Sequence, residues 1–346
     1  MKHVLLAAMV LAKMTMTYPS ESHAAEYSLI NFDDLAGWHE DDHTAALDTF
    51  LQTCSIIKGN DWSSLCKLAK THPDAKTYFE MFFRPVLVED GNPALFTGYF
   101  EPELNGSLHP TSRFRYPLYR KPTNIRGGEL WLTRREIEET GALKGRGLEL
   151  VWVDDPVELF FLQIQGSGRI RMKNGQVLRV GYGGSNGQKY RSIGQELIRR
   201  GIYSKHQVSA QVIRNWVRRN PFEGADLLLH NPSFVFFRKV TKVTADKGPV
   251  GAMNRSVTTG RTLAVDPRFI PLGAPVWLEK GGRDAIQRLM VAQDTGSAIK
   301  GAQRADIFFG TGDRAGLTAG KVRDPGRMVV LMPIQLAFSL VPEGEE

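Results

Sequence analysis

Apolar residues in the first part of the chain recur at the spacing of an α-helix. This pattern predicts a helix over 43–51, a second that Asp61 caps and that runs through Leu68, and a third over 71–83. Pro73 would lie in the first turn of the third helix, where its missing N–H costs nothing. We therefore expect residues 39–82 to be helical.

The middle of the chain mixes the helical and strand periodicities. Residues 169–180 alternate around Asn174-Gly175, which predicts a hairpin with a two-residue turn. Residues 190–200 have helical spacing and end at Gly201. Ser204 is positioned to cap a further helix that stops at Asn220-Pro221.

The last third of the chain alternates with period two between Gly- and Pro-rich turns. Beyond Phe234 the pattern predicts only strands and turns, and a short aromatic run at 95–100 has the same character. Short strands of this kind favour a small barrel over a βαβ sheet. The expected late strands are 234–243, 261–265, 274–279, 287–293, 305–309 and 327–331.

The first 24 residues have the layout of a secretory signal peptide. Lys2 and His3 precede the apolar run 4–12, and Ser22 and Ala24 are small residues at the positions that a signal peptidase reads. We expect cleavage after Ala24 and export to the periplasm. No cysteine follows the apolar run to accept a lipid, so any association with the outer membrane or wall would be peripheral, and no later stretch is long enough to span a bilayer.

The two cysteines and the net charge depend on this location. Cys54 and Cys66 lie 12 residues apart, and an oxidising compartment favours a disulfide over a pair of buried thiols. The net charge of +7 would indicate nucleic acid for a cytoplasmic protein, but for an exported one it equally fits an anionic surface polymer. The basic stretches 191–200 and 214–219 accompany no nucleic-acid motif, so we expect no nucleic-acid partner.

Several short motifs have alternative interpretations. His39-Glu40-Asp41-Asp42-His43 matches the zinc-protease pattern, but its acidic residues fit the first turn of a helix, and we expect no metal. The glycine-rich runs 165–168 and 181–187 follow apolar stretches interpreted as strands, and are either tight turns or loops of a carbohydrate groove. Asp294-Thr295-Gly296 resembles one pepsin-like loop, but such an enzyme needs two.

Ordered blocks along the chain are far more specific than these motifs. They are 97–102 (TGYFEP), 163–168 (QIQGSG), 190–194 (YRSIG), 231–237 (NPSFVFF), 264–267 (AVDP), 270–273 (IPLG), 294–296 (DTG), 298–301 (AIKG) and 305–308 (ADIF). This series resembles the membrane-bound lytic murein transglycosylase A family. Its C-terminal part resembles a module named for three aspartates, matched here by Asp266, Asp294 and Asp306.

The resemblance implies a mainly β fold with peripheral helices. A double-psi β-barrel would form from both ends of the chain, with a smaller β-rich domain inserted and a glycan groove between the two. The expected limits are 1–24 for the signal peptide, 25–110 for the helical segment and first barrel strands, 111–239 for the inserted domain and 240–346 for the rest of the barrel.

The chemistry implied by the resemblance is non-hydrolytic cleavage of the β-1,4 bond between N-acetylmuramic acid (MurNAc) and N-acetylglucosamine (GlcNAc) in peptidoglycan. The product would carry a 1,6-anhydro end, because the sugar's own C6 hydroxyl attacks. One carboxyl, matched by Asp306, would serve as general acid and then base. Asp294 would stay ionised and support it, whereas Asp266 is interpreted as a turn-forming residue.

The opposing wall of the groove would hold the sugars through amide, hydroxyl and aromatic groups. We expect no cofactor. We expect a monomer that acts on glycan strands, with other cell-wall enzymes as candidate partners. The alternatives left open are a non-catalytic glycan-binding wall protein and an aspartic protease. The expected substrate-binding residues are Thr97, Tyr99, Gln165, Ser167, Gly168 and Tyr182.

Overall fold

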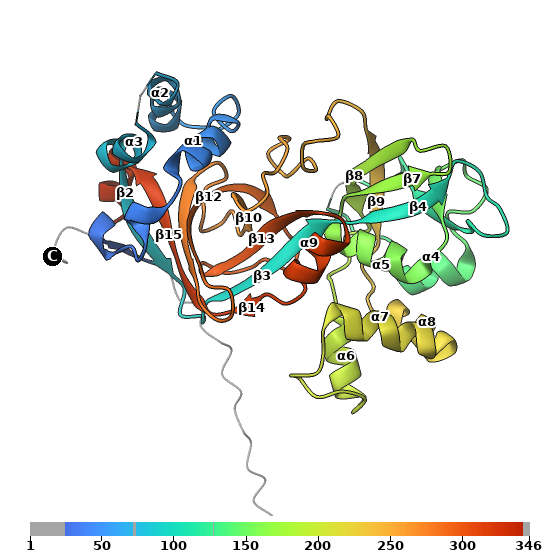
Figure 1. The fold of residues 1–346 in the computed structure, drawn as a ribbon. Helices are drawn as coiled ribbons and strands as arrows, with labels where there is room; N and C mark the ends of the chain where they lie inside the picture. Colours follow the sequence, from blue (N-terminus) through green and yellow to red (C-terminus); the bar gives the residue numbers. More distant parts are fainter. Residues whose placement is uncertain (1–24, 72–73, 127, 342–346) are drawn as a thin grey trace, which may run out of the picture.

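Strands from both ends of the chain form the larger of two sheets in the computed structural model, which describes residues 25–71, 74–126 and 128–341 (Figure 1). Most of its neighbouring strands are antiparallel, but β10 pairs with β12, and β13 with β3, in parallel. In spatial order the strands are β1 (Glu26–Leu29), β2 (Phe83–Glu89), β15 (Gly326–Pro333), β11 (Pro275–Lys280), β12 (Ile286–Thr295), β10 (Thr262–Val265), β13 (Arg304–Thr311), β3 (Leu95–Glu101) and β14 (Arg323–Asp324).

The middle of the chain forms a second, six-stranded sheet. Its two outer strands, β5 and β9, contact each other although they stand at opposite ends of the strand order, so the sheet curls. The hairpin of β7 and β8 forms at the predicted place, but its turn is longer than the predicted two residues, because Met172 pairs with Gln176. The order is β5 (Tyr116–Tyr119), β6 (Glu149–Val153), β4 (Glu103–Ser107), β7 (Gly168–Met172), β8 (Val177–Ser185) and β9 (Val235–Val240).

Helices cover both sheets. Figure 1 shows α1 to α3 beside the larger sheet and α4 to α8 around the smaller one. Two short 3-10 helices, Phe32–Asp34 and Trp38–Glu40, precede α1. The α-helices are α1 (His43–Leu51), α2 (Asn60–Ala69), α3 (Ala75–Phe82), α4 (Arg134–Thr140), α5 (Pro156–Gln165), α6 (Ile193–Arg199), α7 (Ala210–Arg219), α8 (Pro221–Leu229), α9 (Gly312–Ala319) and α10 (Ile334–Leu340).

The first three helices match the prediction, with different ends. Asp61 lies inside the first turn of α2, after Gly59 at the N-cap, so it is not the cap itself. The third helix begins later than predicted, because Asp74 caps it by accepting the N–H of Thr77. Pro73 lies outside the described residues.

The cap predicted at Ser204 is wrong. Ser209 caps α7 by accepting the N–H of Val212, whereas the Ser204 hydroxyl donates to Gln207 within a turn. Both serines satisfy the cap pattern, and Ser209, which is nearer the apolar residues of the helix, acts as the cap. Proline at 221 then starts α8 rather than ending the helical region, since its missing N–H fits a first turn.

The prediction of only strands and turns beyond Phe234 is also wrong, because α9 and α10 both lie there. The loop at 165–168 follows helix α5 rather than a strand. Asp155 caps α5 by accepting two backbone N–H groups, and Gly166 ends it with a φ of 76°. The apolar residues of α5 were compatible with either element, and the caps at its two ends decide for the helix.

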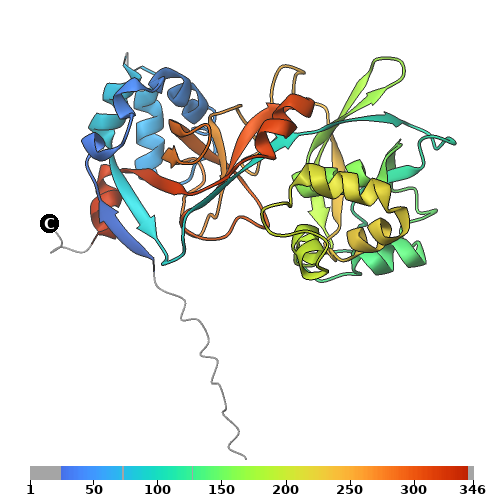
Figure 2. The same ribbon diagram turned by 60° about the horizontal axis from the view of Figure 1, so that its bottom comes forward.

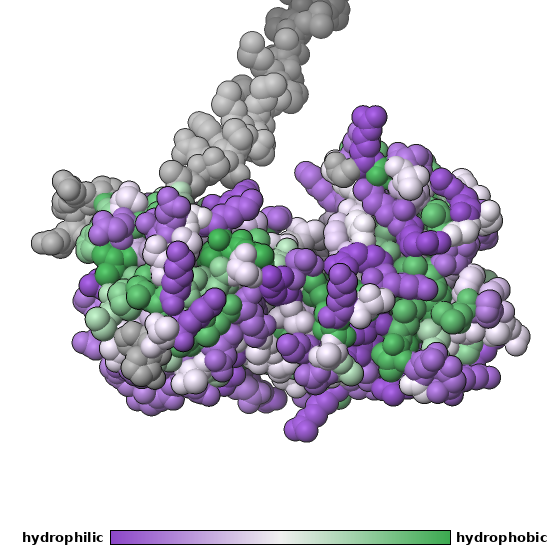
Figure 3. All heavy atoms as spheres, turned by 90° about the horizontal axis from the view of Figure 1, so that it is seen from above, coloured by the Kyte–Doolittle hydropathy of each residue, from purple (hydrophilic) through white to green (hydrophobic). Residues whose placement is uncertain are grey.

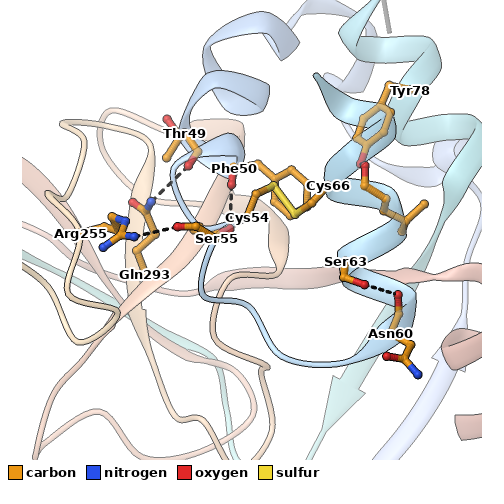
Figure 4. The surroundings of a disulfide bond; sticks show 12 residues. Thr49, Phe50, Cys54, Ser55, Asn60, Ser63, Cys66, Tyr78, Arg255 and Gln293 are labelled. Carbon is orange, nitrogen blue, oxygen red and sulfur yellow. Dashed lines mark hydrogen bonds between the residues drawn. A yellow bond between two sulfur atoms is a disulfide. The ribbon is translucent and has the colours of Figure 1, made fainter. Parts of the chain in front are cut away.

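The predicted disulfide between Cys54 and Cys66 is present and links the segment after α1 to α2 (Figure 4). Two hydrogen bonds tie α1 and the segment after it to strand β12 and to the loop before β10. The Gln293 side chain donates to the Thr49 carbonyl (3.2 Å), and Arg255 donates to the Ser55 hydroxyl (2.7 Å). The disulfide therefore joins α2 to a part of the chain that already contacts the barrel.

The chain crosses between the sheets at β3–β4, where only Pro102 separates the strands, and returns after β9; Figure 2 shows the first crossing as one long ribbon. Glu101 is fully buried at the crossing. Its carboxylate accepts hydrogen bonds from Arg169 (2.8 Å), Arg179 (3.1 Å) and Thr311 (2.8 Å). The space-filling view shows two lobes with a largely hydrophilic surface and a notch between them (Figure 3).

Candidate active site

Two of the three aspartates singled out by the sequence lie on one row of the large sheet. The central strand β10 separates them, and its Ala264 is the register partner of both Asp294 and Asp306. Thr97 on β3 extends the row as the partner of Asp306. Directly opposed residues project from the same face, and two strand spacings put the two aspartate Cα atoms about 10 Å apart.

Asp306 is a partly buried carboxyl at the cleft surface with one strong donor. The Thr97 hydroxyl donates to it (2.8 Å) and accepts in turn from Arg304 (2.8 Å). Burial raises the pKa of Asp306 to about 6, against the opposing effects of the Thr97 hydrogen bond and the Arg304 charge. Asp294 raises this pKa too, but it is the smallest of the four influences. A carboxyl of this kind can donate a proton near neutral pH.

Asp294 is surrounded differently. Its carboxylate accepts the N–H groups of Ala252 (2.9 Å) and Thr295 (2.9 Å) and the hydroxyl of Tyr99 (3.0 Å). Burial raises its pKa, while these three hydrogen bonds act in the opposite direction by stabilising the ionised form. No hydrogen bond joins Asp294 to Asp306 in the described structure, so the two do not form the proton-sharing pair of an aspartic protease.

Asp266 is the most buried of the three, with no exposed surface. It accepts the N–H of Gly301 (3.0 Å) and a forked pair of bonds from the Arg268 guanidinium. Burial opposes ionisation, but these hydrogen bonds and the Arg268 charge outweigh it and lower the pKa of Asp266 to about 2. Asp266 therefore holds two loops together as a permanent anion, in keeping with its interpretation as a turn residue.

A cleft of 770 Å³ opens over the aspartates, with one wall from each sheet. Asp294, Asp306 and Tyr99 lie on the large-sheet wall, and the loop after α5 and strand β8 form the other. Of the predicted substrate-binding residues, Tyr99, Gln165, Ser167 and Tyr182 line this cleft. Their placement makes them available to a ligand, and their binding role stays a prediction.

The other two predicted groove residues lie behind the cleft surface. Thr97 contacts Asp306 rather than the open cleft. Gly168 begins β7, where an added Cβ would come within 2.9 Å of the Pro102 carbonyl, so the position needs glycine for packing. Gln165 also has a structural contact, since its side-chain oxygen accepts the N–H of Phe100 (3.1 Å) and ties the two walls together.

Sequence reasoning missed two contributors. Arg304 stands two residues before Asp306, and strand alternation places both on one face, so this signal was available. Ala252 acts through its backbone N–H and leaves no trace in the sequence.

The zinc-like motif lies at the start of α1, away from the cleft. Asp42 caps the helix by accepting the N–H of Ala45, so His39 and His43 are not one turn apart on a helix. His39 pairs with Asp33, and the His43 ring packs edge-on against Trp38. Within the described ranges no three His, Cys, Asp or Glu side chains are grouped so that they could hold a metal ion.

Comparison with known proteins gives a consistent family. Residues 95–238 match the family model of the MltA specific insert domain, and residues 261–332 match that of the 3D domain. Membrane-bound lytic murein transglycosylase A of Vibrio cholerae is 34% identical over 273 residues, which cover 75% of this chain and 71% of that protein. The Escherichia coli K12 protein of the same name is 38% identical over 247 residues, 68% of this chain and 65% of the relative.

Solved structures agree over nearly the whole fold. A membrane-bound lytic murein transglycosylase from Agrobacterium tumefaciens superposes with a TM-score of 0.82 at 30% identity, covering 91% of this chain and 99% of the other. Escherichia coli MltA with bound chitohexaose gives a TM-score of 0.72 at 29% identity, covering 89% and 94%. These likenesses confirm the predicted fold class of two β-rich parts with peripheral helices. This chain belongs to the membrane-bound lytic murein transglycosylase A family.

Proposed function

We propose that this chain cleaves the β-1,4 bond between MurNAc and GlcNAc in peptidoglycan without water, leaving 1,6-anhydro-MurNAc ends. The observation that carries this proposal is Asp306, a partly buried carboxyl with a pKa raised to about 6 on the wall of the cleft. At pH 7 such a group is protonated in about one molecule in ten, and a bound glycan that displaces water raises this fraction.

The proton balance of the reaction needs only this one group. Asp306 donates its proton to the glycosidic oxygen as the bond to C1 breaks, which releases the GlcNAc hydroxyl. The C6 hydroxyl of MurNAc then bonds to C1 and gives its proton back to the Asp306 carboxylate. Thr97 fixes the orientation of the carboxyl through its hydrogen bond, and Arg304 holds Thr97 in place.

Asp294 supports the transition state in this proposal. Positive charge develops on the sugar ring as the bond breaks. Burial raises the pKa of Asp294, but this positive charge and the three hydrogen-bond donors favour its ionised form, which stabilises the charge at short range. The reaction needs no attack by Asp294 on the sugar, since the C6 hydroxyl of MurNAc is the nucleophile. We therefore assign Asp294 a supporting role and Asp306 the acid and base roles.

The opposite wall orients the glycan. The side-chain oxygen of Gln165 accepts from the backbone, which leaves its amide N–H groups to donate to N-acetyl carbonyls. Tyr182 is 55% exposed at the cleft and offers a ring face to a sugar. The Ser167 hydroxyl can act as donor or acceptor. The chitohexaose in the Escherichia coli relative supports a glycan in this cleft.

We also propose that the protein is exported to the periplasm and acts there as a monomer, with other cell-wall enzymes as partners. The predicted signal peptide, residues 1–24, lies outside the described residues. The disulfide supports an oxidising compartment. None of the helices in the described ranges combines the length and hydropathy that a bilayer crossing requires.

Digestion of purified sacculi followed by mass spectrometry of the fragments tests the activity. We expect anhydro-ended muropeptides, and a loss of activity of about 10²–10⁴-fold in Asp306→Asn. Asp313→Asn, the same change at an exposed position on α9, serves as the control and should keep full activity. Reducing ends would identify a hydrolase, uncut glycan a binding protein, and cut peptides a protease; each result would overturn the proposal.

A further inference from the structure

A second cavity, of 490 Å³, lies beside the cleft in the smaller sheet. It forms where the outer strands β5 and β9 approach each other and the sheet curls. No group of the proposed mechanism lies in it. Its lining residues are Arg120, Lys121, Glu149, Leu150, Gly183, Phe237, Arg238 and Lys239.

The charge of this cavity is strongly one-sided. Four cations, Arg120, Lys121, Arg238 and Lys239, face a single carboxylate, Glu149. No ion pair involves any of the five among the residues that the structure describes, although most of the other arginines of this sheet and its helices are paired with carboxylates. Unpaired cations that share one cavity favour an anionic ligand, because charge-assisted hydrogen bonds to carboxylates are the strong ones.

The four cations keep donors free for such a ligand. Arg120 donates to the Gly147 carbonyl (2.7 Å) and Arg238 to the Tyr182 carbonyl (3.2 Å), which leaves other N–H groups of each guanidinium available. The described structure shows no hydrogen bond for the two lysine ammonium groups. The backbone contacts hold the two arginines in position, while the lysines are free to adapt.

The cavity adjoins the cleft. Arg238 lines both, and Gly183 of the cavity directly follows Tyr182 of the cleft wall. An added Cβ at Gly183 would come within 2.7 Å of the Phe237 backbone, so this part of the strand presents no side chain between the two spaces. A substituent on a sugar in the cleft could therefore extend past Arg238 into the cavity.

We propose that this cavity binds the carboxylates of the peptide stem attached to MurNAc, so that the protein reads the stem as well as the glycan. The inference rests on the proposed function, which places the glycan in the cleft. A stem residue spans up to about 3.3–3.6 Å, so the second and third residues reach about 7–11 Å from the sugar. Free carboxylates on those residues are the anions that the four cations accept.

The test compares one glycan in two forms. Strands that carry stems and the same strands stripped by an amidase are given to the wild type and to Lys121→Glu/Lys239→Glu, whose changed residues line the cavity but not the cleft. We expect kcat/KM on stem-bearing strands to fall by about tenfold or more at low salt, while activity on stripped strands changes by less than about twofold. The control is Lys173→Glu, which reverses the charge of one exposed lysine in the β7–β8 turn, away from the cavity.

Two results would overturn the inference: an equal loss on both substrates, or no loss on either. Stripping frees the lactyl carboxylate, so a loss on stripped strands would identify that group as the ligand instead. A second measurement does not depend on turnover. Asp306→Asn protein should bind a muramyl tetrapeptide about tenfold more weakly when both lysines are changed, while its affinity for chitohexaose stays the same. If the wild type cleaves no glycan but still binds the tetrapeptide through the two lysines, the proposed function is refuted and the stem site is supported.

Discussion

Three aspartates of one sheet show how surroundings decide the chemistry of identical side chains. The pKa of Asp306 is raised to about 6 because burial outweighs the Thr97 hydrogen bond and the Arg304 charge. The pKa of Asp266 is lowered to about 2, although it is fully buried, because Arg268 and the N–H of Gly301 hold its charge. The pKa of Asp294 is also raised, because burial outweighs the three donors that favour its ionised form. The balance of burial against donors separates a carboxyl with a raised pKa from a structural anion.

The pH dependence of turnover should follow Asp306. A general acid must carry its proton, so activity is present below the pKa of Asp306 and declines as pH rises through about 6 in the free enzyme. A profile of kcat/KM against pH on soluble glycan strands measures this alkaline limb. A rate that stays flat from pH 5 to pH 8 would exclude Asp306 as the acid.

Stability should reveal the same buried charge. The folded pKa of Asp306 lies above its unfolded value of 3.8, so the ionised form destabilises the native state. This destabilisation is absent well below the unfolded pKa and reaches about 3 kcal/mol above pH 6. Asp306→Asn should therefore raise the free energy of unfolding at pH 8 and leave it unchanged at pH 3.5. Urea titrations at both pH values measure the difference. An equal effect at both would contradict this explanation.

Tyr99→Phe tests how Asp294 is held. The variant keeps the ring, which packs at 5.1 Å from Phe308, and removes only the hydroxyl that donates to Asp294. We expect the pKa of Asp294 to rise, since one donor to the ionised form is lost. If ionised Asp294 is required, the acidic limb of the pH–rate profile should move to higher pH. An unchanged limb with normal folding would remove Asp294 from the proposed mechanism.

At the scale of elements, caps decided where helices begin and end, and periodicity decided where they exist. The three N-terminal helices and the late strands of the large sheet follow the hydrophobic pattern. Of the missed helices, α9 and α10 are short, and α5 is mostly apolar, so that its pattern does not separate a buried strand from a helix. Asp155 and Gly166 at its ends were the local signals that could have identified it.

The Cys54–Cys66 bridge should stabilise the helical segment. It closes a loop of 12 residues, for which the chain-entropy model gives about 3 kcal/mol. Cys54→Ser/Cys66→Ser should lose about this much free energy of unfolding. The wild type under reducing conditions should match the double variant. A reductant-dependent change in the double variant would point to another cause, since the described residues contain no free cysteine.

At the scale of the whole molecule, the cleft exists because two sheets are held side by side. Glu101 lies where the chain passes from one sheet to the other, and Arg169 and Arg179 of the smaller sheet meet it there. Both arginines also donate to the Lys247 carbonyl in the returning segment. This buried cluster joins the two crossings and thereby fixes how the cleft walls face each other.

Breaking that cluster should be costly. Glu101→Gln leaves two arginines of the junction without their carboxylate, for which we expect a loss of about 3–5 kcal/mol. The neighbouring pair of Glu103 and Arg171 is largely exposed, so Glu103→Gln should cost less than about 1 kcal/mol. Equilibrium unfolding of the two variants gives the comparison. Equal losses would show that the buried cluster does not set the junction.

The sequence predicted six of the nine strands of the large sheet, the disulfide pair and the three candidate aspartates, because these depend on local periodicity, on two cysteines in a chain with a signal-peptide pattern and on ordered motifs. The surroundings of each aspartate, and with them its pKa, depend on the tertiary structure. Asp306 meets Thr97 across 209 residues of chain, and Asp294 meets Tyr99 across 195. Burial and donors that come from so far along the chain leave no local pattern, so the pKa of a carboxyl and the basic cavity beside the cleft appear only once the chain is folded.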